Sequence, residues 1–423
     1  MGVFKQLFQF NYTREEKAWI AQDWANSVYS LMITTAIFPL FYKTVAHNAG
    51  ISDANSTAYL GYANSIATIV VSIMAPILGA IADYKGMRTP MFTIGTMMGI
   101  ISVWAMMFVG GDQWLLLLIF YALSAIGFAA SNIFYDSSIM DVTTYKRMDQ
   151  VSSAGYGFGY IGSCIPFIIF MIIMLFSGLD SDLIVKIGFF IAGLWWFAFT
   201  IPYWKIVKQK TFLEPKENVV VESFKRLATT VKKISEHRQV FLFLLAYFFY
   251  IDGVGTIIKM ATAVGSDVGI SDNGLIIILL IVQVVAFPFS ILYGNLSKRF
   301  GAKNMLFVGI ATYITICLMA LNLKTFNDFL ILAICIGTAQ GGIQSLSRSI
   351  FGQIIPANQS NEFFGFYNIF GKFSSVLGTT LLGIIAQQTG RSLNGVFSLI
   401  VLFLIGGVLL FFVKLTPHTQ EEE

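Results

Sequence analysis

The chain has 423 residues, of which 56% are hydrophobic, 15% are aromatic and only 12% are charged. A soluble domain carries about 25% charged residues, so the composition excludes an ordinary soluble protein and predicts a chain that lies largely within a bilayer. The formal net charge is only +4, and because membrane topology accounts for the basic residues, we expect no nucleic-acid partner.

Long apolar runs predict the membrane-spanning helices. A helix needs about 20 apolar residues to cross the hydrocarbon core, and the chain contains twelve such runs. In chain order they lie at residues 17–43, 58–82, 90–109, 114–139, 151–176, 184–204, 239–263, 273–296, 304–322, 328–354, 363–387 and 393–414. The predicted fold is therefore an all-α membrane protein with twelve transmembrane helices.

The longest connection, residues 205–238, separates six predicted spans from six. We expect an N-terminal six-helix bundle at 1–204, a cytoplasmic linker at 205–238 and a C-terminal six-helix bundle at 239–423. Within the linker, Val220, Phe224, Leu227, Val231 and Ile234 are spaced four, three, four and three residues apart, which predicts an amphipathic helix on the inner leaflet. A solvated basic linker is the alternative, since three glutamates interrupt the basic face.

The distribution of Lys and Arg predicts the orientation. Basic residues near span ends stay on the cytoplasmic side, and in the loops only Lys43, Lys186, Lys324 and Arg391 fall on the opposite side. We therefore expect cytoplasmic N- and C-termini. The predicted location is a bacterial plasma membrane, with the chain as a multi-pass protein.

Three acids and three bases fall inside predicted spans: Asp23, Asp136, Asp252, Lys259, Arg348 and Lys372. A central Asp, Lys or Arg costs about 2.5–3.5 kcal/mol on insertion scales, so such residues usually face a protein interior or a wet cavity and have partners. They could bind a substrate, or they could pair across helices as structural locks. The sequence leaves both interpretations open.

Polar neighbours of these charges recur at helical spacing, so each set lines one helix face. We predict a substrate- or proton-binding set that consists of Asp23, Asn26, Asn132, Tyr135, Asp136, Asp252, Thr256, Lys259, Gln340, Gln344, Arg348 and Lys372. The three cysteines lack metal-ligand spacing. We expect no metal, no cofactor and no enzymatic activity, because no Ser/His/Asp set, HExxH or Walker loop is present.

A basic, glycine-containing turn occurs once in each half, at residues 79–88 and 294–303. The first copy resembles the cytoplasmic signature of the major facilitator superfamily, and Lys298 stands in the second copy where the first has an aspartate. The resemblance implies a conformational latch, acidic only in the first half. Its residues are Gly79, Asp83, Gly86, Arg88, Gly294, Arg299, Gly301 and Lys303.

Longer motifs at residues 23–29, 250–257, 340–349 and 362–367 resemble the vacuole effluxer-like branch of that superfamily, the autophagy-related amino-acid effluxers. The resemblance implies two pseudo-symmetric six-helix bundles that work by alternating access, with spans 1, 4, 7 and 10 around a central cavity. Eukaryotic members of the branch are linked to release of amino acids from the vacuole.

We therefore expect a secondary transporter for a small polar solute, with an amino acid as the first candidate. Asp23 or Asp252 would carry the coupling proton, because burial raises the pKa of a carboxylate while a neighbouring base lowers it, and a substrate could change that balance. A uniporter, or a lipid or amphiphile flippase or exporter on the same fold, is the alternative. Members of the superfamily commonly act as monomers, and we expect the same here.

Overall fold

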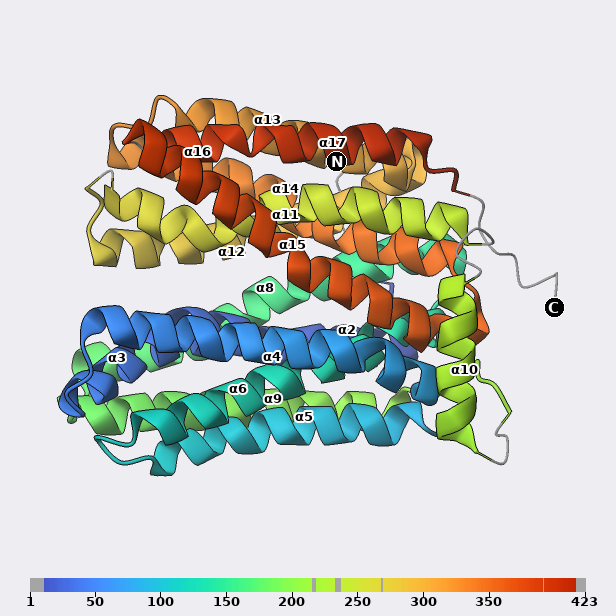
Figure 1. The fold of residues 1–423 in the computed structure, drawn as a ribbon, viewed down its shortest axis with the longest axis horizontal. Coiled ribbons are helices and arrows are strands. Elements are labelled where there is room, and N and C mark those ends of the chain that lie inside the picture. The colour runs from blue at the N-terminus through green and yellow to red at the C-terminus, as the bar shows by residue number, and fades with distance from the viewer. Residues whose placement is uncertain (1–10, 215–217, 233–236, 268, 391, 416–423) are drawn as a thin grey trace.

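The computed structural model describes residues 11–214, 218–232, 237–267, 269–390 and 392–415. The secondary structure in these ranges is helical apart from one isolated bridge between Tyr84 and Leu213. They contain twelve helical segments that are long and apolar enough to cross a bilayer. The helices form two groups that lie side by side, the N-terminal half in blue and green and the C-terminal half in yellow to red (Figure 1). The predicted all-α fold of twelve spans is confirmed.

The N-terminal half contains six spans, and the first of them is assembled from three consecutive pieces. These pieces are α2 (Arg14–Val28), the π-helix η1 (Tyr29–Ile37) and α3 (Phe38–Asn48). The other helices of this half are α4 (Asp53–Ala82), α5 (Arg88–Ala105), η2 (Met106–Phe108), α6 (Trp114–Ser137), α7 (Ile139–Val142), α8 (Tyr145–Phe176) and α9 (Ser181–Ile206).

The C-terminal half also contains six spans. Its helices are α11 (Arg238–Asp267), α12 (Asp272–Phe300), α13 (Ala302–Ala320), α14 (Phe326–Ile354), η3 (Ala357–Gln359), α15 (Ser360–Thr389), α16 (Ser392–Ser398) and α17 (Ile400–Phe412). The run predicted as one span at 393–414 is therefore divided at Leu399 into α16 and α17.

Local sequence signals explain where several helices begin and end. Thr13 and Glu16 form a reciprocal capping box at the start of α2, and Thr325 and Asp328 form another at the start of α14. Gly301, with φ of +83°, separates α12 from α13, a conformation that a residue without Cβ adopts at low cost. These signals define where the spans begin and end, because apolar composition alone does not specify the ends of a helix.

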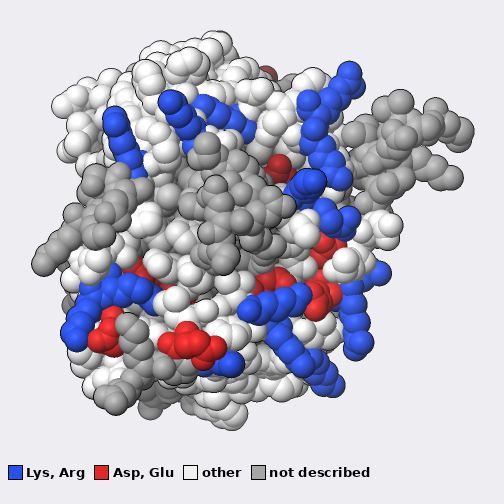
Figure 2. Space-filling model, turned by 90° about the vertical axis from the view of Figure 1, so that its right-hand side faces the viewer, with Lys and Arg blue, Asp and Glu red and all other residues white. Residues whose placement is uncertain are grey.

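The linker between the halves contains the helix α10 (Val219–Lys232), which lies across one end of the bundle (Figure 1). This helix covers the linker residues at which the apolar spacing predicts one, as far as Lys232, and Ile234 lies outside the described ranges. Val220 and Phe224 are exposed on it. We call this end of the molecule the linker end and the opposite one the far end; Lys and Arg side chains gather on the linker-end face (Figure 2).

Candidate functional site

A cavity of about 1030 Å³ lies between the two halves. Its wall includes Leu60, Leu275 and Phe329, which lie within the first eight residues of α4, α12 and α14 at the far end. Its innermost polar residues include Asp136 and Arg348. The cavity therefore runs from the centre of the bundle toward the far end.

Arg348 is the centre of the buried charge network. It lies on α14, yet its guanidinium reaches into the N-terminal half, where Nη2 is 2.9 Å from Asp23 Oδ2 and Nη1 is 2.9 Å from Asp136 Oδ1. Nε donates a hydrogen bond to the Ser152 hydroxyl at 3.0 Å, and Nη2 donates to the Ser152 carbonyl at 3.0 Å. One base thus holds two acids, on α2 and α6, and ties both to α8.

Aromatic rings surround the same guanidinium. Its central carbon lies 4.3 Å from the ring centroid of Tyr156 and 4.6 Å from that of Trp19. Trp19 is itself fixed, because its indole N–H donates to the Tyr135 carbonyl and the Ser138 hydroxyl, each at 3.1 Å. A guanidinium is weakly hydrated and stacks well on rings, so this environment stabilises a charge that is almost fully buried.

Polar side chains continue the wall beyond the charges. The Asn26 amide donates to Asn132 Oδ1 at 2.7 Å, linking α2 to α6. Across the seam between the halves, the Tyr160 hydroxyl donates to Gln344 Oε1 at 2.8 Å. A solute in the cavity therefore meets amide and hydroxyl groups from both halves.

Nine of the twelve predicted binding residues line the cavity: Asp23, Asn26, Asn132, Asp136, Lys259, Gln340, Gln344, Arg348 and Lys372. Tyr135 lies behind the wall, stacked on Trp19 with ring centroids 4.6 Å apart. Asp252 and Thr256 are also outside the wall, fully buried between α11 and α15. The structure therefore brings Asp23 and Asp136 together and separates Asp252 from them.

Asp252 has a different environment from the one expected of a cavity acid. Both of its carboxylate oxygens lie 2.9 Å from the backbone N–H of Gly378 on α15, and one accepts the Thr256 hydroxyl at 3.3 Å. A Cβ on Gly378 would come within 2.7 Å of this carboxylate. The acid consequently ties α11 to α15 at a point where only glycine fits.

The first span carries a π-helix at the level of the cavity, which the sequence analysis did not predict. Tyr29, Ser30, Thr34 and Thr35 of η1 line the wall, and the Thr35 hydroxyl donates to the Ser30 carbonyl at 2.8 Å. Segments of π-helix occur often at functional sites. Here the wide turn presents polar groups of one short stretch to the cavity.

Between the cavity and the linker end, the halves touch directly. The Ser152 hydroxyl donates to the Ser345 carbonyl at 2.8 Å, and the Ser290 hydroxyl donates to the Ser153 carbonyl at 2.8 Å. Closer to the linker end, Asp149 of α8 accepts hydrogen bonds from Ser349 and from Gln353, the latter at 2.8 Å. These contacts between α8 and the C-terminal helices close the cavity on this side.

The first copy of the duplicated turn adds a second closure. Asp83 Oδ1 accepts the backbone N–H and side-chain amide of Asn361 at 2.8 and 2.9 Å, and Oδ2 accepts the Glu362 N–H at 3.3 Å. Asp83 therefore sits at the N-terminus of α15, where helix dipole and open N–H groups favour a carboxylate. The predicted latch aspartate thus joins the two halves.

Arg226 of the linker helix, which the sequence did not single out, completes this latch. Its Nε lies 2.6 Å from Glu362 Oε2, and its Nη2 lies 2.8 Å from both Asp83 Oδ2 and the Ala80 carbonyl. Burial raises the pKa of Asp83 to about 7 against the opposing effects of Arg226 and Asn361, and nearby Glu362 raises it further. A basic residue in the linker between the halves normally faces water, so the spacing of residues along the sequence could not have identified this contact.

The remaining latch residues of the first copy act within their own half. Gly86, with φ of +76°, forms the turn, and its N–H donates to Gln209 at 3.1 Å. Arg88 forms a buried ion pair with Asp141. Gly79 is the exception, because a Cβ there would lie 2.2 Å from the Asn361 carbonyl oxygen of the other half.

The second copy repeats the close approach but lacks the acid. A Cβ on Gly294 would lie 2.6 Å from Ser153, so this glycine permits contact between α12 and α8 as Gly79 does between α4 and α15. Lys303 donates to the carbonyls of Phe411 and Val413 at the end of α17, and Arg299 stacks on Phe300. Lys298, which stands in this copy where the first has Asp83, is exposed.

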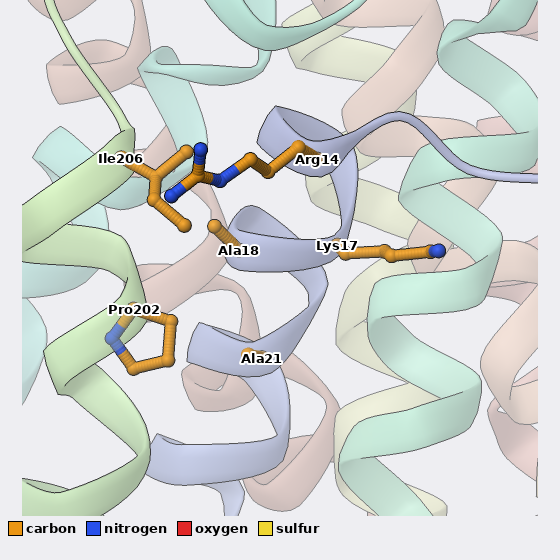
Figure 3. A pocket seen from close by; sticks show the side chains of 6 residues that line it. All are labelled: Arg14, Lys17, Ala18, Ala21, Pro202 and Ile206. Atoms are coloured by element: carbon orange, nitrogen blue, oxygen red, sulfur yellow. The ribbon is translucent and has the colours of Figure 1, made fainter.

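A second pocket, of about 400 Å³, lies between α2 and α9 near the linker end (Figure 3). It is lined by Arg14, Lys17, Ala18, Ala21, Pro202 and Ile206. The ion-paired charges of the bundle centre are absent from this lining, so the central cavity is the candidate site. Among the described residues no cluster of His, Cys, Asp or Glu could hold a metal ion.

The chain is similar to known protein sequences along almost all of its length. The family described as vacuole effluxer Atg22 like matches residues 11–141 and 139–423. An uncharacterized MFS-type transporter, YxiO, from Bacillus subtilis strain 168 is 51% identical over 414 residues, which cover 97% of each chain. Autophagy-related protein 22-2 of Aspergillus clavatus is 27% identical over 60% of this chain, which spans only 46% of that longer relative.

Solved structures with the same fold come from the major facilitator superfamily. The human organic anion transporter MFSD10 superposes with a TM-score of 0.73 over 93% of this chain and 99% of that one, at 12% identity. The proton:xylose symporter XylE superposes with a TM-score of 0.72 over 95% of each chain, also at 12% identity. At such low identity these similarities show the fold alone.

Proposed function

The chain belongs to the Atg22-like vacuole effluxer family within the major facilitator superfamily, and we propose that this membrane transporter is a secondary carrier of small polar solutes, with amino acids as first candidates. It would work by alternating access, each half rocking against the other around the central cavity. Proton coupling at the buried acids is part of the proposal.

The observation that carries the proposal is the position of the intramembrane charges. Asp23, Asp136 and Arg348 meet at the base of a cavity of about 1030 Å³, where the two halves touch, and not on the lipid-facing surface. Charges in a membrane interior are costly, and they persist where they serve a solute or ion pathway. With the linker end in the cytoplasm, as the basic loops favour, the observed conformation is open to the outside.

The coupling site proposed here is the acid pair that shares Arg348. Two carboxylates bound to one guanidinium carry one excess negative charge, which a single proton would neutralise. A solute group that competes for Arg348 would change how strongly this pair holds that proton, which is the linkage a symporter needs. Asp252 is a weaker candidate than the sequence indicated, because it lies outside the cavity wall.

Uptake by proteoliposomes tests the proposal. The purified protein is reconstituted and offered radiolabelled amino acids with and without an inwardly directed proton gradient. We expect gradient-dependent uptake that Asp23→Asn abolishes. Lys186→Gln should leave uptake intact, because that base is half-buried, pairs with Asp182 where α9 begins and does not line the cavity. Uptake that ignores pH and membrane potential would indicate a uniporter, and scrambling of labelled lipid without solute uptake would indicate a flippase.

A further inference from the structure

The pocket of about 400 Å³ between α2 and α9 lies where the N-terminal half meets lipid. Arg14 and Lys17, which line it, are both exposed. The middle of α9 exposes apolar side chains, since Phe190 and Leu194 are 46% and 45% exposed. Pro202 of the pocket follows Leu194 after about two turns, on the same face of the helix. In a chain that crosses a bilayer, an exposed apolar face of this kind contacts the membrane, so the molecule beside this pocket is a lipid.

The pocket lies at the depth of the lipid headgroups. Arg14 is the first residue of α2, and Ile206 is the last residue of α9. The first span, Arg14–Asn48, has 35 residues, and at about 1.5 Å per residue it is about 50 Å long, against about 30 Å for the hydrocarbon core. Divided between both ends, this excess places about 10 Å of helix beyond the core at each end. The first turns of α2 therefore face headgroups.

Arg14 combines with small apolar residues in this pocket. Its side chain extends from α2 toward α9 and ends near Ile206, whereas Lys17 extends away from α9 (Figure 3). A guanidinium presents several N–H donors in a geometry that matches a phosphate group. Ala18 and Ala21 leave the space beneath it open and apolar. The pocket thus offers a charged group and an apolar floor to the same molecule.

The positive charge of Arg14 has no counter-ion within the protein. No acid in the described ranges forms an ion pair with Arg14 or Lys17. Both neighbouring glutamates are already paired: Glu15 Oε2 lies 2.6 Å from Lys210 Nζ, and Glu16 Oε2 lies 2.7 Å from an arginine of α8. Arg14 also occupies the first turn of α2, where the helix dipole disfavours a positive charge. Helix stability therefore does not account for this base, and its charge is available to a ligand.

Further bases border the same corner of the molecule. Lys205 directly precedes Ile206 at the end of α9, and Lys208 follows two residues later. Both are exposed, and neither forms an ion pair with an acid of the described ranges. Such a cluster beside a membrane surface favours anionic lipids over neutral ones.

We infer that the pocket between α2 and α9 binds an anionic phospholipid, with the phosphate on Arg14 and an acyl chain along the exposed face of α9. Basic pockets between spans on the cytoplasmic side suit such headgroups, and the basic loops favour a cytoplasmic linker end. The phosphate receives charge-assisted hydrogen bonds, while the acyl chain covers Pro202 and Leu194. This site goes beyond the proposed function, because it lies on the outer surface of one half and takes a lipid instead of a transported solute.

Titration of the purified full chain with two lipids that differ in charge tests the site. Dioleoyl phosphatidylglycerol and dioleoyl phosphatidylcholine carry the same acyl chains, and native mass spectrometry counts the lipids bound at each concentration. We expect the first phosphatidylglycerol to bind at least about 5-fold more tightly, the effect of one base near a membrane surface on an anionic lipid. Equal affinity for the two lipids overturns the inference.

Variants assign this preference to the pocket. Arg14→Gln should lower the preference for phosphatidylglycerol about 5-fold, and Arg14→Lys, which keeps the charge, should retain most of it. Lys298→Gln is the matched control, because that base is exposed at the linker end of α12. Equal effects of Arg14→Gln and Lys298→Gln would indicate diffuse attraction to the basic face and would overturn the site.

The apolar floor is tested separately from the charge. Ala21→Phe fills the space beneath Arg14 and leaves every base in place, so it should weaken the first binding event of both lipids. Its thermal unfolding, measured without added lipid, separates a blocked pocket from a misfolded protein. Wild-type lipid binding in a folded Ala21→Phe variant overturns the inference.

Inorganic phosphate distinguishes a lipid from a soluble anion at the same place. We expect phosphatidylglycerol to raise the unfolding temperature through Arg14 and millimolar phosphate to leave it unchanged. Equal stabilisation by phosphate, lost in Arg14→Gln, would identify a soluble anion as the ligand and overturn the lipid site. These measurements involve no transport, so their failure would leave the proposed carrier in place, and an absence of solute uptake would leave the lipid site in place.

Discussion

Replacing Arg226 with Gln should open the linker end of the protein. In the observed conformation the Arg226 side chain is only 16% exposed and bridges Asp83 and Glu362, whose side chains are 1% and 0% exposed. Removing one member of a buried ion pair costs about 3–5 kcal/mol, because the remaining charge stays buried without compensation. The cost falls on the closed linker end alone, since opening it would expose both carboxylates to water.

The lower end of that range applies here. Asp83 keeps the Asn361 and Glu362 N–H groups when Arg226 is lost. About 3 kcal/mol corresponds to a change of about 10²-fold in the equilibrium between closed and open linker ends. A ratio of 99:1 between closed and open linker ends would become nearly 1:1, a change that is large enough to observe directly.

Distances between spin labels on the two halves measure this shift. Thr89 on α5 and Lys298 on α12 are exposed at the linker end, and both can be converted to Cys after the three native cysteines are replaced. Arg226→Gln should add a longer distance to the distribution. Lys225→Gln is the matched control, because that base is 68% exposed and pairs with Glu222 at the surface, where such pairs contribute little.

A double variant sharpens the interpretation. Arg226→Gln combined with Glu362→Gln removes one uncompensated carboxylate, so the closed population should partly recover. An unchanged distance distribution in Arg226→Gln, or identical behaviour of Arg226→Gln and Lys225→Gln, would refute the claim that the linker helix holds this end closed.

Three further outcomes are expected. In the closed conformation Asp83 faces Arg226, Glu362 and Asn361, and its pKa is raised to about 7, against about 3.9 in water. The fraction of molecules with a closed linker end should therefore fall as the pH rises from about 4 through 7. A distance between the spin labels that does not change with pH would contradict this. Gly79→Ala places a Cβ 2.2 Å from the Asn361 carbonyl, whereas Gly61→Ala on the same helix meets nothing within 4 Å. In the spin-label experiment Gly79→Ala should favour the open linker end by about 1–3 kcal/mol. Equal label distances in the Gly79→Ala and Gly61→Ala variants would argue against the contact. Arg348→Lys keeps the positive charge but loses the planar guanidinium, whose separate N–H groups bind two carboxylates at once. Initial uptake rates should therefore fall about 10- to 100-fold, the range for loss of one charged hydrogen bond. Uptake at wild-type rates would remove Arg348 from the coupling site.

The predicted spans illustrate what could be inferred before the fold. Apolar run length locates twelve helices because each must cover the same hydrocarbon thickness, and the described spans overlap all twelve predicted runs. Breaks within a span were not predicted. The π-helix at Tyr29–Ile37 and the division at Leu399 lie inside continuous apolar runs, and a hydropathy pattern carries no signal for such breaks.

The candidate site shows the same limit. Helical spacing identified Asp23, Asp136 and Arg348 as members of polar faces, but it could not tell that Arg348 crosses the seam to bind both acids. The same reasoning ranked Asp252 beside Asp23 as a cavity acid. In the structure Asp252 binds the backbone of α15 instead.

The sequence by itself determined the number of spans, the division into two groups of six and the short list of charges that a bilayer would reject. These properties follow from composition and from periodicity along single helices, which are local. The tertiary structure alone decided which charges meet and that Arg226 of the linker secures the closed end. Those relations depend on distances between segments far apart in the chain, and the spacing of residues along one helix fixes only the face on which each side chain lies.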